Sequence, residues 1–557
     1  MQQAETDVLI IGTGGAGLYA AIRAAEAGMR VTIWEKGLVG RSGGTVSGAG
    51  VSAVGPWSDP ADSPDLHFQD TVIGGSYLSD QPLAKILAEE AGERVQELES
   101  WGLCFDKEAD GRYVLDVAGG HTYPRVMAIS DRVGLQMTKV LRSRLLCFDA
   151  ERQQDVVTTR LLTENGRITG ALGLDLRHGE VLQITTPSVI LATGGIGQLY
   201  PVTSNPVQVT GDGLALALEA GAACINMEQV QFYPCGLVHP PSLRGFILGI
   251  QEYAKLFNKD NERFMGRYEP ENFEHTTRDR LARGIYSEIA AGRGTEHGGV
   301  YLDATDLPET TFRSFMHEIE ICAERGFDYR KQRVEIGPAA HFYMGGVGID
   351  EQSQTSIEGL FAAGEVSGGV QGGNRLSGNS LSEILVFGSR AGASAAQHAR
   401  SQHTEKSDPA AALAEEKRLQ ALLKRTGSGL NPYQGKNQLR AIMQEHVGVV
   451  RSADGLNTAR KQLQELAGKT LPEIAVHGSH FHHNQSLLSY LELEMMLQAA
   501  QAMVEAALNR QESRGAHFRE DYPKLDASEP PYCTEVGWEH NSPTVRRRPV
   551  RLTEIEP

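Results

Sequence analysis

Residues 7–36, DVLIIGTGGAGLYAAIRAAEAGMRVTIWEK, decide the fold that this sequence predicts. The stretch begins with an apolar run at 7–11, which is typical of a strand buried on both faces. A glycine-rich turn of the form GxGxxG follows at 12–17, and small residues from there to Ala27 would let a helix pack closely on a sheet. A second apolar strand then ends at Glu35. This order of strand, turn, helix, strand and acid predicts a dinucleotide-binding unit.

Each part of this unit has a physical role in binding. Glycines permit the tight turn and let backbone N–H groups approach a pyrophosphate, whose charge the start of the helix favours. The acid can accept hydrogen bonds from a ribose. A glycine-rich turn without a ligand is the alternative, but the complete order favours a cofactor site. The predicted contacts are Gly12, Thr13, Gly14, Gly15, Ala16, Gly17 and Glu35.

A glycine- and serine-rich loop, KGLVGRSGGTVSGAG, follows the acid at 36–50. A loop of this composition beside the cofactor strand can wrap a large ligand with backbone donors. The cofactor contacts predicted in it are Lys36, Ser42, Gly43, Gly44 and Thr45.

Length, charge and cysteine usage restrict the class of protein. A chain of 557 residues predicts two or three domains, and its net charge of −17 argues against binding to nucleic acid or to an anionic membrane. Its six cysteines show no CxxC spacing, so we expect neither a disulfide framework nor an iron–sulfur or zinc site of the chain's own. We also expect no leader and no membrane span, which predicts a cytoplasmic protein.

Several later motifs make a resemblance to a known family specific. The chain resembles the flavoprotein subunit of the succinate dehydrogenase/fumarate reductase family, whose relatives include L-aspartate oxidase and adenylylsulfate reductase. The resemblance covers about residues 6–525. Its motifs are QFYPCG (231–236), RDRLAR (278–283), AAHFYMGG (339–346), NRLSGNSL (374–381) and ESRGAHFRED (512–521).

The resemblance implies FAD as the cofactor and a fold of the α/β class. In the dehydrogenase branch a histidine before a Thr-Val-Ser tripeptide holds FAD covalently, but here Gly43 and Gly44 precede that tripeptide, so we expect FAD without a covalent bond. The implied fold is a Rossmann-like FAD-binding domain with an inserted α+β capping domain and a C-terminal helical domain. The expected boundaries are 1–231 and 346–395 for the FAD-binding domain, 232–345 for the cap, 396–525 for the helical domain and 526–557 for a tail without a further signal.

The resemblance also assigns roles to single residues. Arg278 matches the catalytic acid/base, while His341 and Arg375 match residues that hold a substrate carboxylate. Taken without the resemblance, Arg278 would sit on a mixed-charge surface helix and His341 would be a packed core residue. Tyr233 stands where a substrate-binding histidine is usual. The further FAD contacts implied are Asp212, which would otherwise be a helix N-cap, Glu365, Ser380 and Leu381.

Three features depart from the family pattern or leave alternatives open. Counting without gaps places Phe246, Ile247 and Ile250 on the Thr, Glu and Arg of a family element that binds substrate and relays protons. The nearby candidates to replace them are Arg244, Glu252 and Tyr253.

A GGH segment at 119–121 is similar to the L-aspartate oxidase branch, and His121 and Arg125 either face the substrate or form a solvent-facing turn. Histidines 477, 480, 482 and 483 lack a supporting acid or cysteine pattern, so a solvated loop is favoured over a metal site.

The predicted function is an FAD-dependent oxidoreductase of the fumarate reductase/succinate dehydrogenase type. It would interconvert a carbon–carbon single and double bond next to the carboxylate of a small substrate. The resemblance implies that the electron partner is an external iron–sulfur protein of the same complex, placed near 512–521, and any membrane association would come through partner subunits. The alternatives are oxidation of an amino acid, as in L-aspartate oxidase, and a flavin electron-transfer subunit without catalysis.

Overall fold

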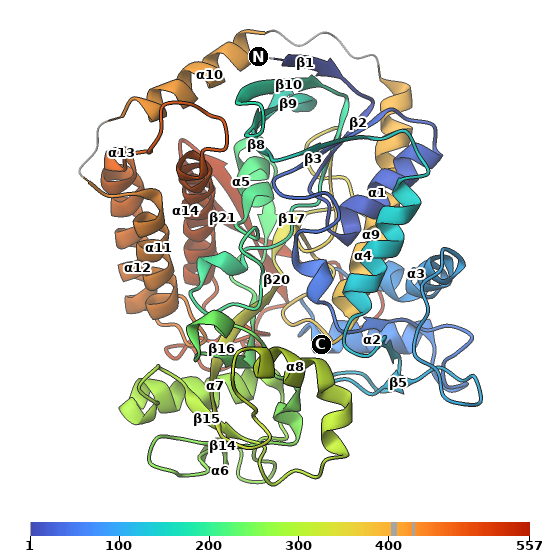
Figure 1. Cartoon of the computed structure of the whole chain (residues 1–557), viewed down its shortest axis with the longest axis vertical. Coiled ribbons are helices and arrows are strands. Elements are labelled where there is room, and N and C mark those ends of the chain that lie inside the picture. Colours follow the sequence, from blue (N-terminus) through green and yellow to red (C-terminus); the bar gives the residue numbers. More distant parts are fainter. Residues whose placement is uncertain (1, 403–408, 426–428) are drawn as a thin grey trace.

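The computed structural model describes residues 2–402, 409–425 and 429–557. Its centre is a five-stranded, all-parallel sheet whose apolar strands are buried, as the run at 7–11 predicts (Figure 1). In spatial order the strands are β18 (Leu360–Ala362), β11 (Ser188–Leu191), β2 (Val8–Ile11), β3 (Val31–Glu35) and β7 (Glu151–Gln154).

Two helices cross this sheet in close contact because small residues line their seam. Helix α1 (Gly15–Glu26) follows the glycine-rich turn, and α9 (Asn379–Ser401) lies against it. A Cβ added at Gly392 of α9 would lie 2.3 Å from Ala20 O of α1, so this approach requires glycine. Helix α4 (Val133–Leu145) packs beside α1 on the same side of the molecule (Figure 1).

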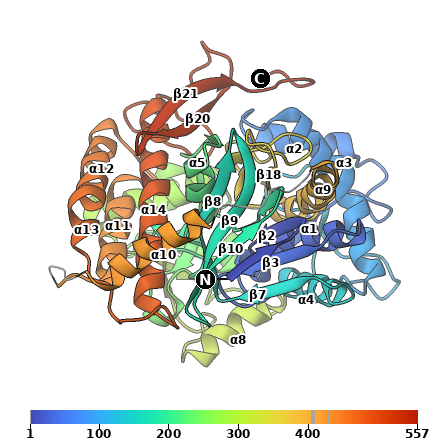
Figure 2. The same cartoon turned by 90° about the horizontal axis from the view of Figure 1, so that it is seen from above.

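A second sheet joins distant parts of the chain. Its order is β19 (Ser367–Gly368), β17 (Gly346–Gly348), β12 (Cys224–Ile225), β20 (Tyr532–Glu539) and β21 (Ser542–Pro549). Residues 526–557, in which the sequence gives no signal, therefore contain a hairpin that extends the FAD-binding region; Figure 2 shows it at one edge of the molecule. A third, four-stranded sheet contains β1 (Gln2–Glu5), β10 (Glu180–Thr185), β9 (Arg167–Asp175) and β8 (Val156–Glu164).

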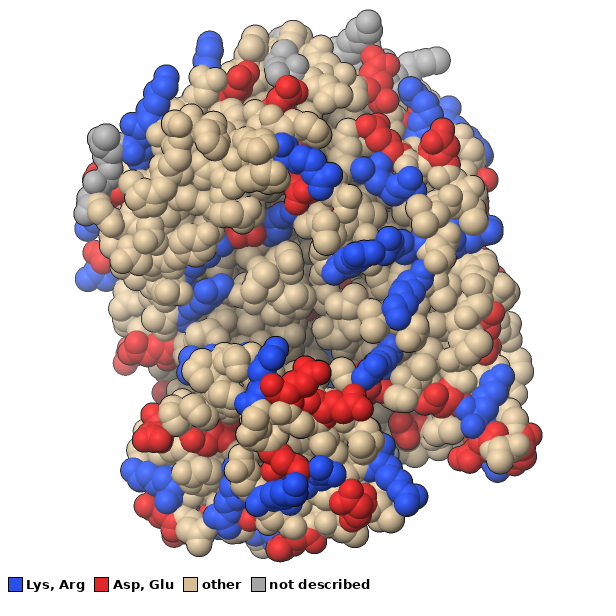
Figure 3. Space-filling view, in the orientation of Figure 1, with Lys and Arg blue, Asp and Glu red and all other residues tan. Residues whose placement is uncertain are grey.

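The cap has a hydrophobic core of its own. Its antiparallel sheet is ordered β13 (Val230–Leu237), β16 (Val334–Tyr343), β15 (Val300–Asp303) and β14 (Lys255–Phe257), with α7 (Arg278–Glu288) and α8 (Met316–Glu324) beside it. The cap lies at the bottom of Figure 1, and the space-filling view shows an indentation where it meets the rest of the molecule (Figure 3). On this face acidic and basic side chains are interspersed.

The helical region lies on the opposite side from α1 (Figures 1 and 2). Its helices are α10 (Ala410–Leu423), α11 (Pro432–His446), α12 (Ala453–Glu465), α13 (Leu471–Glu473) and α14 (Gln485–Asn509). The remaining elements are β4 (Val51–Ser52), α2 (Pro64–Gly74), α3 (Gln81–Ser100), β5 (Leu115–Asp116), β6 (Val126–Met127), α5 (Asp212–Glu219) and α6 (Met265–Tyr268). In the described ranges, no helix has both the length and the apolar character needed to cross a membrane.

Candidate active site

The glycine-rich turn has the geometry that its sequence predicts. Gly12 has φ +95°, and a Cβ added there would lie 2.5 Å from Ala192 O of the neighbouring strand end. Gly17 brings α1 so close that an added Cβ would lie 2.1 Å from Gly12 O. Any side chain at these two positions would separate the helix from the sheet.

Three helices begin around this region with a glycine N-cap and without a capping side chain. These caps are Gly14 before α1, Gly211 before α5 and Gly378 before α9. Helix starts without side-chain caps leave backbone N–H groups available to anionic ligand groups. The donor set fits the phosphates of a dinucleotide such as FAD.

Glu35 lies beside the turn, as the sequence predicts. Its carboxylate accepts hydrogen bonds from Thr13 N at 2.8 Å and from Gly37 N at 2.9 Å. The loop after it folds back over the turn, where Thr45 Oγ1 accepts from Gly15 N at 3.0 Å. Glu35 and Thr45 thus lie on the two sides of the glycine-rich turn.

The ammonium group of Lys36 is bound to other protein groups. Its ammonium contacts Thr210 Oγ1 at 2.7 Å and Asp212 Oδ2 at 2.8 Å, and it pairs with Glu492 Oε1 of α14 at 2.8 Å. Lys436 of α11 pairs with the same glutamate. Three acceptors use all three protons of Lys36, so its role is to join Asp212 to the helical region.

Glu365 and Glu383 are two buried carboxyl groups near the loop that carries Arg375. Glu365 accepts from Tyr343 N at 3.0 Å, and Glu383 accepts from Gln371 Nε2 at 2.7 Å. Burial raises the pKa of Glu365 to about 7 and that of Glu383 to about 8. The sequence analysis missed Glu383, although it lies only two residues beyond the NRLSGNSL motif.

Ser380 and Leu381 lie in the first turn of α9, and Leu381 packs on the glycine-rich loop at 36–50. A Cβ added at Gly48 of that loop would lie 2.8 Å from Leu381 Cδ2. An added Cβ at Gly44 would lie 4.0 Å from Glu365 Oε2. The structure therefore brings the loop, α9 and Glu365 together, as expected for residues that share one cofactor.

The four predicted catalytic residues also meet, although they come from four separate segments: α7, β13, β16 and the loop before α9. Arg278, at the start of α7, has its Cζ 5.0 Å from the ring centre of Tyr233 on β13. The rings of Tyr233 and His341 are 5.4 Å apart between centres. His341 and Phe342 are neighbours on β16, and the Cζ of Arg375 lies 4.9 Å from the ring centre of Phe342.

Arg375 is a buried cation that forms no ion pair with another described residue. Its NH2 donates to Gln231 Oε1 at 3.0 Å and its NH1 donates to Leu376 O at 3.0 Å, but its buried Nε has no hydrogen-bond partner among the described residues. Burial, followed by repulsion from Arg278, lowers its pKa to about 9. A ligand carboxylate would remove both penalties.

His341 is held in its neutral form. Burial, followed by the positive charges of Arg375 and Arg278, places its pKa well below the ordinary value. Its Nδ1 lies 2.8 Å from Ser204 Oγ, a contact that the sequence analysis missed because Ser204 belongs to no motif. A neutral imidazole oriented by a hydroxyl can form a hydrogen bond with a ligand without adding a third charge to the site.

The segment that departs from the family pattern is apolar in the structure. Gly236 forms an isolated bridge with Ile247, so this segment lies beside β13. Phe246 and Ile247 are partly buried against the cap core, and Ile250 is fully buried in it. Of the candidate replacements, Arg244 and Tyr253 are both exposed, and the side chain of Glu252 lies outside the described residues.

His121 and Arg125 do not form a solvent-facing turn. Arg125 is fully buried and pairs with Asp62 and Asp70, in each case at 2.6 Å. His121 Nε2 donates to Ser377 O at 2.6 Å, which places it under the loop between Arg375 and α9. Arg125 also contacts His121, at 3.2 Å, so both residues belong to a buried polar network beside the loop that follows Arg375.

Among the described residues, one group has the spacing of a metal site, formed by Glu296, His297 and Glu335 on the cap. The histidines between 477 and 483 do not form such a group in that part of the chain.

Comparison with known proteins gives concordant results along the chain. The family model described as "FAD binding domain" matches residues 7–381, and that described as "Fumarate reductase flavoprotein C-term" matches 436–557. The chain is 43% identical to one of the subunits of the fumarate reductase (CoM/CoB) of Methanothermobacter marburgensis, over 93% of this chain and 95% of that protein. Among solved structures, the Mycobacterium smegmatis Sdh1 complex has a TM-score of 0.92 at 35% identity, covering 100% of this chain and 96% of that one. The E. coli quinol fumarate reductase FrdA also has a TM-score of 0.92, at 31% identity over 100% and 98% of the two chains.

Proposed function

This chain belongs to the fumarate reductase and succinate dehydrogenase flavoprotein family, and on that premise we propose which of its residues carry the reaction. The chain is an FAD-dependent oxidoreductase acting on CH–CH groups, as its sequence predicts. Its α/β fold, with a capping domain and a C-terminal helical region, agrees with the expectation.

The site is built to bind a carboxylate and to supply a proton. Arg375 and neutral His341 hold the carboxylate, and this contact strengthens as negative charge develops on the substrate. FAD, which the glycine-rich turn and the start of α9 would hold, would supply hydride-transfer chemistry for one of the two reacting carbons. Arg278, oriented by the ring of Tyr233, transfers the proton at the other carbon. The observation that carries this proposal is the buried Arg375, whose Nε has no partner among the described residues.

The test is anaerobic flavin bleaching with a panel of small acids. Reduced holoprotein is mixed with unsaturated acids, and oxidised holoprotein with saturated acids and amino acids that include L-aspartate. Re-oxidation by an unsaturated acid supports the proposal. Bleaching by L-aspartate alone would instead assign oxidation of a C–N bond, and no response to any acid would assign an electron-transfer subunit.

We further propose that the far end of the substrate differs from that of a plain four-carbon dicarboxylate. Phe246 and Ile247 stand where the family places polar groups, and an unpaired carboxylate desolvated by apolar groups costs about several kcal/mol. A substrate with one carboxylate and a less polar far end fits these side chains better. If fumarate and succinate turn over faster than every other acid in the panel, this proposal is wrong.

FAD is proposed to be held without a covalent bond, because Gly43 and Gly44 provide no nucleophile before Thr45. An external electron partner is proposed because the chain has no CxxC spacing and four of its six cysteines are buried. An iron–sulfur subunit suits this role, and it would also provide any association with a membrane.

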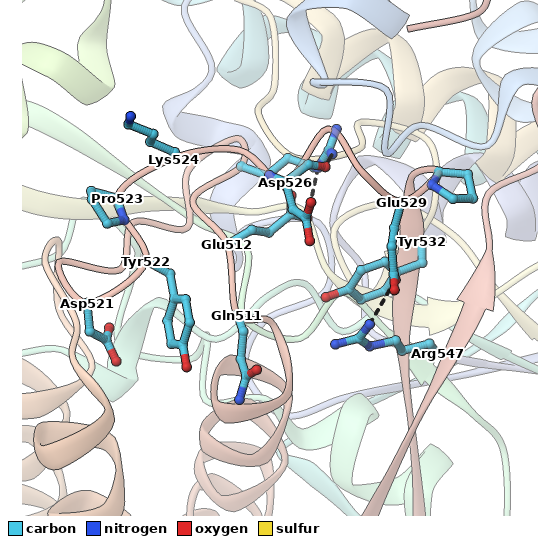
Figure 4. Close-up of a pocket in the computed structure, with 12 residues that line it drawn as sticks. Gln511, Glu512, Asp521, Tyr522, Pro523, Lys524, Asp526, Glu529, Tyr532 and Arg547 are labelled. Carbon is cyan, nitrogen blue, oxygen red and sulfur yellow. Dashed lines mark hydrogen bonds and ion pairs between the residues drawn. The ribbon is translucent and has the colours of Figure 1, made fainter.

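A hollow of about 660 Å³ offers a docking surface for that subunit. It lies between the loop at 511–530 and the C-terminal hairpin, and Figure 4 shows Tyr522, Lys524 and Arg547 at its walls. Charge reversal by Arg547→Glu should lower the iron that copurifies with the tagged chain. Lys469→Glu, on an exposed side chain of the helical region, is the matched control.

A further inference from the structure

A largely buried loop near the C-terminal end of the helical region packs directly on the loop that carries Arg375. Residues 512–519 form a compact turn in which Arg514 N donates to His517 O at 3.0 Å. His517 and Arg519 are almost completely buried, so the turn is a fixed part of the molecule. Its outer side, through Glu512 and Arg514, lines the hollow seen in Figure 4.

The contact between the two loops is made by backbone atoms. Ala516 N donates to Gly373 O at 2.8 Å, two residues before Arg375. Gly515 has φ +61°, and a Cβ added there would lie 2.4 Å from Gly373 O and 2.5 Å from Gly373 C. No flexible side chain can absorb such a clash, so an added methyl group has to displace the loop at 373–375.

Two buried glutamines fix the same pair of loops to the start of β13. Gln229 donates through Nε2 to Arg514 O at 3.3 Å and accepts from His517 N at 3.2 Å. Gln231 donates to Arg375 O at 2.9 Å and accepts from Arg375 NH2 at 3.0 Å. Residues 229–231 therefore form hydrogen bonds both with the turn at 512–519 and with the guanidinium of Arg375.

We infer that residues 512–519 are a positioning brace that sets the place of the Arg375 guanidinium for the substrate carboxylate. The inference rests on the proposed role of Arg375. The brace acts through its backbone contact with Gly373 and through Gln229, which lies two residues before the Gln231 that holds Arg375. Displacing it should weaken carboxylate binding while the cofactor stays in place.

The test is Gly515→Ala in the FAD-loaded protein. Acetate and malonate are titrated, and binding is followed by the change in flavin absorption. The dissociation constant of both probes should rise about tenfold, since a charged hydrogen bond loses its alignment. FAD content should stay at the wild-type value.

The matched control is Gly166→Ala. Gly166 also has a positive φ, +75°, but a Cβ added there meets nothing within 4 Å. The Gly166→Ala variant reproduces the conformational cost of alanine at a positive φ without touching the site. Its dissociation constants for acetate and malonate should therefore equal those of the wild type. If Gly515→Ala does not fold, Gln229→Met removes both hydrogen bonds to the turn at similar side-chain volume and should raise the same constants.

A double-mutant cycle with Arg375→Lys separates the brace from a general loss of structure. If the brace acts through Arg375, Gly515→Ala should have little further effect in the lysine background. Full additivity, or equal binding by Gly515→Ala and Gly166→Ala, would overturn the inference. If Arg375→Lys alone leaves both probes bound as before, the proposed function of Arg375 fails instead.

Discussion

Single side chains in this site are constrained by the charges around them. Arg278 and Arg375 repel each other, and their positive charges help to keep His341 neutral. We therefore expect the site to have the highest affinity for an anion when both guanidinium groups face that anion. The proton-transfer role proposed for Arg278 can be separated from this electrostatic role by substitution.

Arg278→Ala should lower turnover by about a hundred- to thousand-fold or more, because the developing charge loses its partner. Arg278→Lys can transfer protons, so partial and pH-dependent turnover should remain. Arg280→Ala, on the same helix with its side chain mostly exposed, is the control and should turn over normally. Turnover at the wild-type rate by an FAD-loaded Arg278→Ala protein would refute the mechanism.

Glu318 gives the cap a pH-dependent stability. Its Oε1 accepts from Gly249 N at 2.8 Å, and burial raises its pKa from the ordinary 4.5 to about 7. The folded state therefore binds this proton more tightly, so its stabilising effect is complete below pH 4.5 and is lost as the pH rises through 7.

Glu318→Gln should keep the neutral form at every pH. We expect the variant to be more stable than the wild type at pH 8 by about 2 kcal/mol, and to match it near pH 4.5. Thermal melting at the two pH values measures this difference. A difference that does not change with pH would exclude Glu318 as its origin.

Gly44 determines whether FAD is released when the protein is denatured. Since no histidine precedes Thr45, acid denaturation should release intact FAD into the supernatant. Absorption and mass of the supernatant flavin measure this release. Yellow colour that stays with the precipitated protein would disprove it.

At the scale of elements, helix α14 of the helical region stabilises the end of β3, the strand that carries Glu35. Glu492 pairs with both Lys36 and Lys436, and all three side chains are almost buried. Removing the anion leaves Lys436 without its carboxylate partner and Lys36 paired with Asp212 alone. This should loosen the end of β3, where Glu35 lies.

Glu492→Gln should therefore release FAD about tenfold faster than the wild type. The rise in flavin fluorescence after dilution measures the release rate. Glu505→Gln is the control, because Glu505 lies on the same helix and pairs with Arg460 at 2.6 Å inside the helical region. Equal release rates for the two variants would contradict the role of Glu492.

The elements also show how far sequence can predict this molecule. The glycine-rich turn was predictable because its strand, helix and acid are neighbours in the chain. Arg278, His341 and Arg375 could be named as candidates because each lies in a specific motif, and their catalytic roles stay predictions. Strand β21 was not predictable from sequence, because it is mostly exposed and rich in arginine, a composition that is typical of a tail. Arg125 was ambiguous because its partners, Asp62 and Asp70, lie more than fifty residues away.

At the scale of the whole molecule, the C-terminal hairpin completes the FAD-binding region. Cys224 and Ile225 of β12 pair with Val536 and Glu535 of β20. Further along, the backbone N–H groups of residues 553–555 all donate to Gln81 Oε1. Removing residues 530–557 would expose the edge of β12 and leave buried polar groups without hydrogen-bond partners.

A chain ended at residue 529 should therefore fail to retain FAD. Adding the peptide 530–557 should restore retention, and a scrambled peptide of the same composition should not. Gel filtration with detection at the flavin wavelength measures the bound cofactor. Full FAD content in the shortened chain would show that the hairpin is dispensable.

The pairing between Thr534 and Glu228 has a consequence for biosynthesis. Thr534 Oγ1 donates to Glu228 Oε2 at 2.6 Å, across 306 positions of the chain. On the ribosome, the region around Glu228 emerges long before the hydroxyl that pairs with it, so this part of the fold closes only when translation has passed residue 534. If FAD retention requires the C-terminal hairpin, as predicted above, we expect stable cofactor loading to follow the synthesis of residue 534. A product of premature termination would present an open strand edge, a feature that makes incompletely folded chains prone to aggregation.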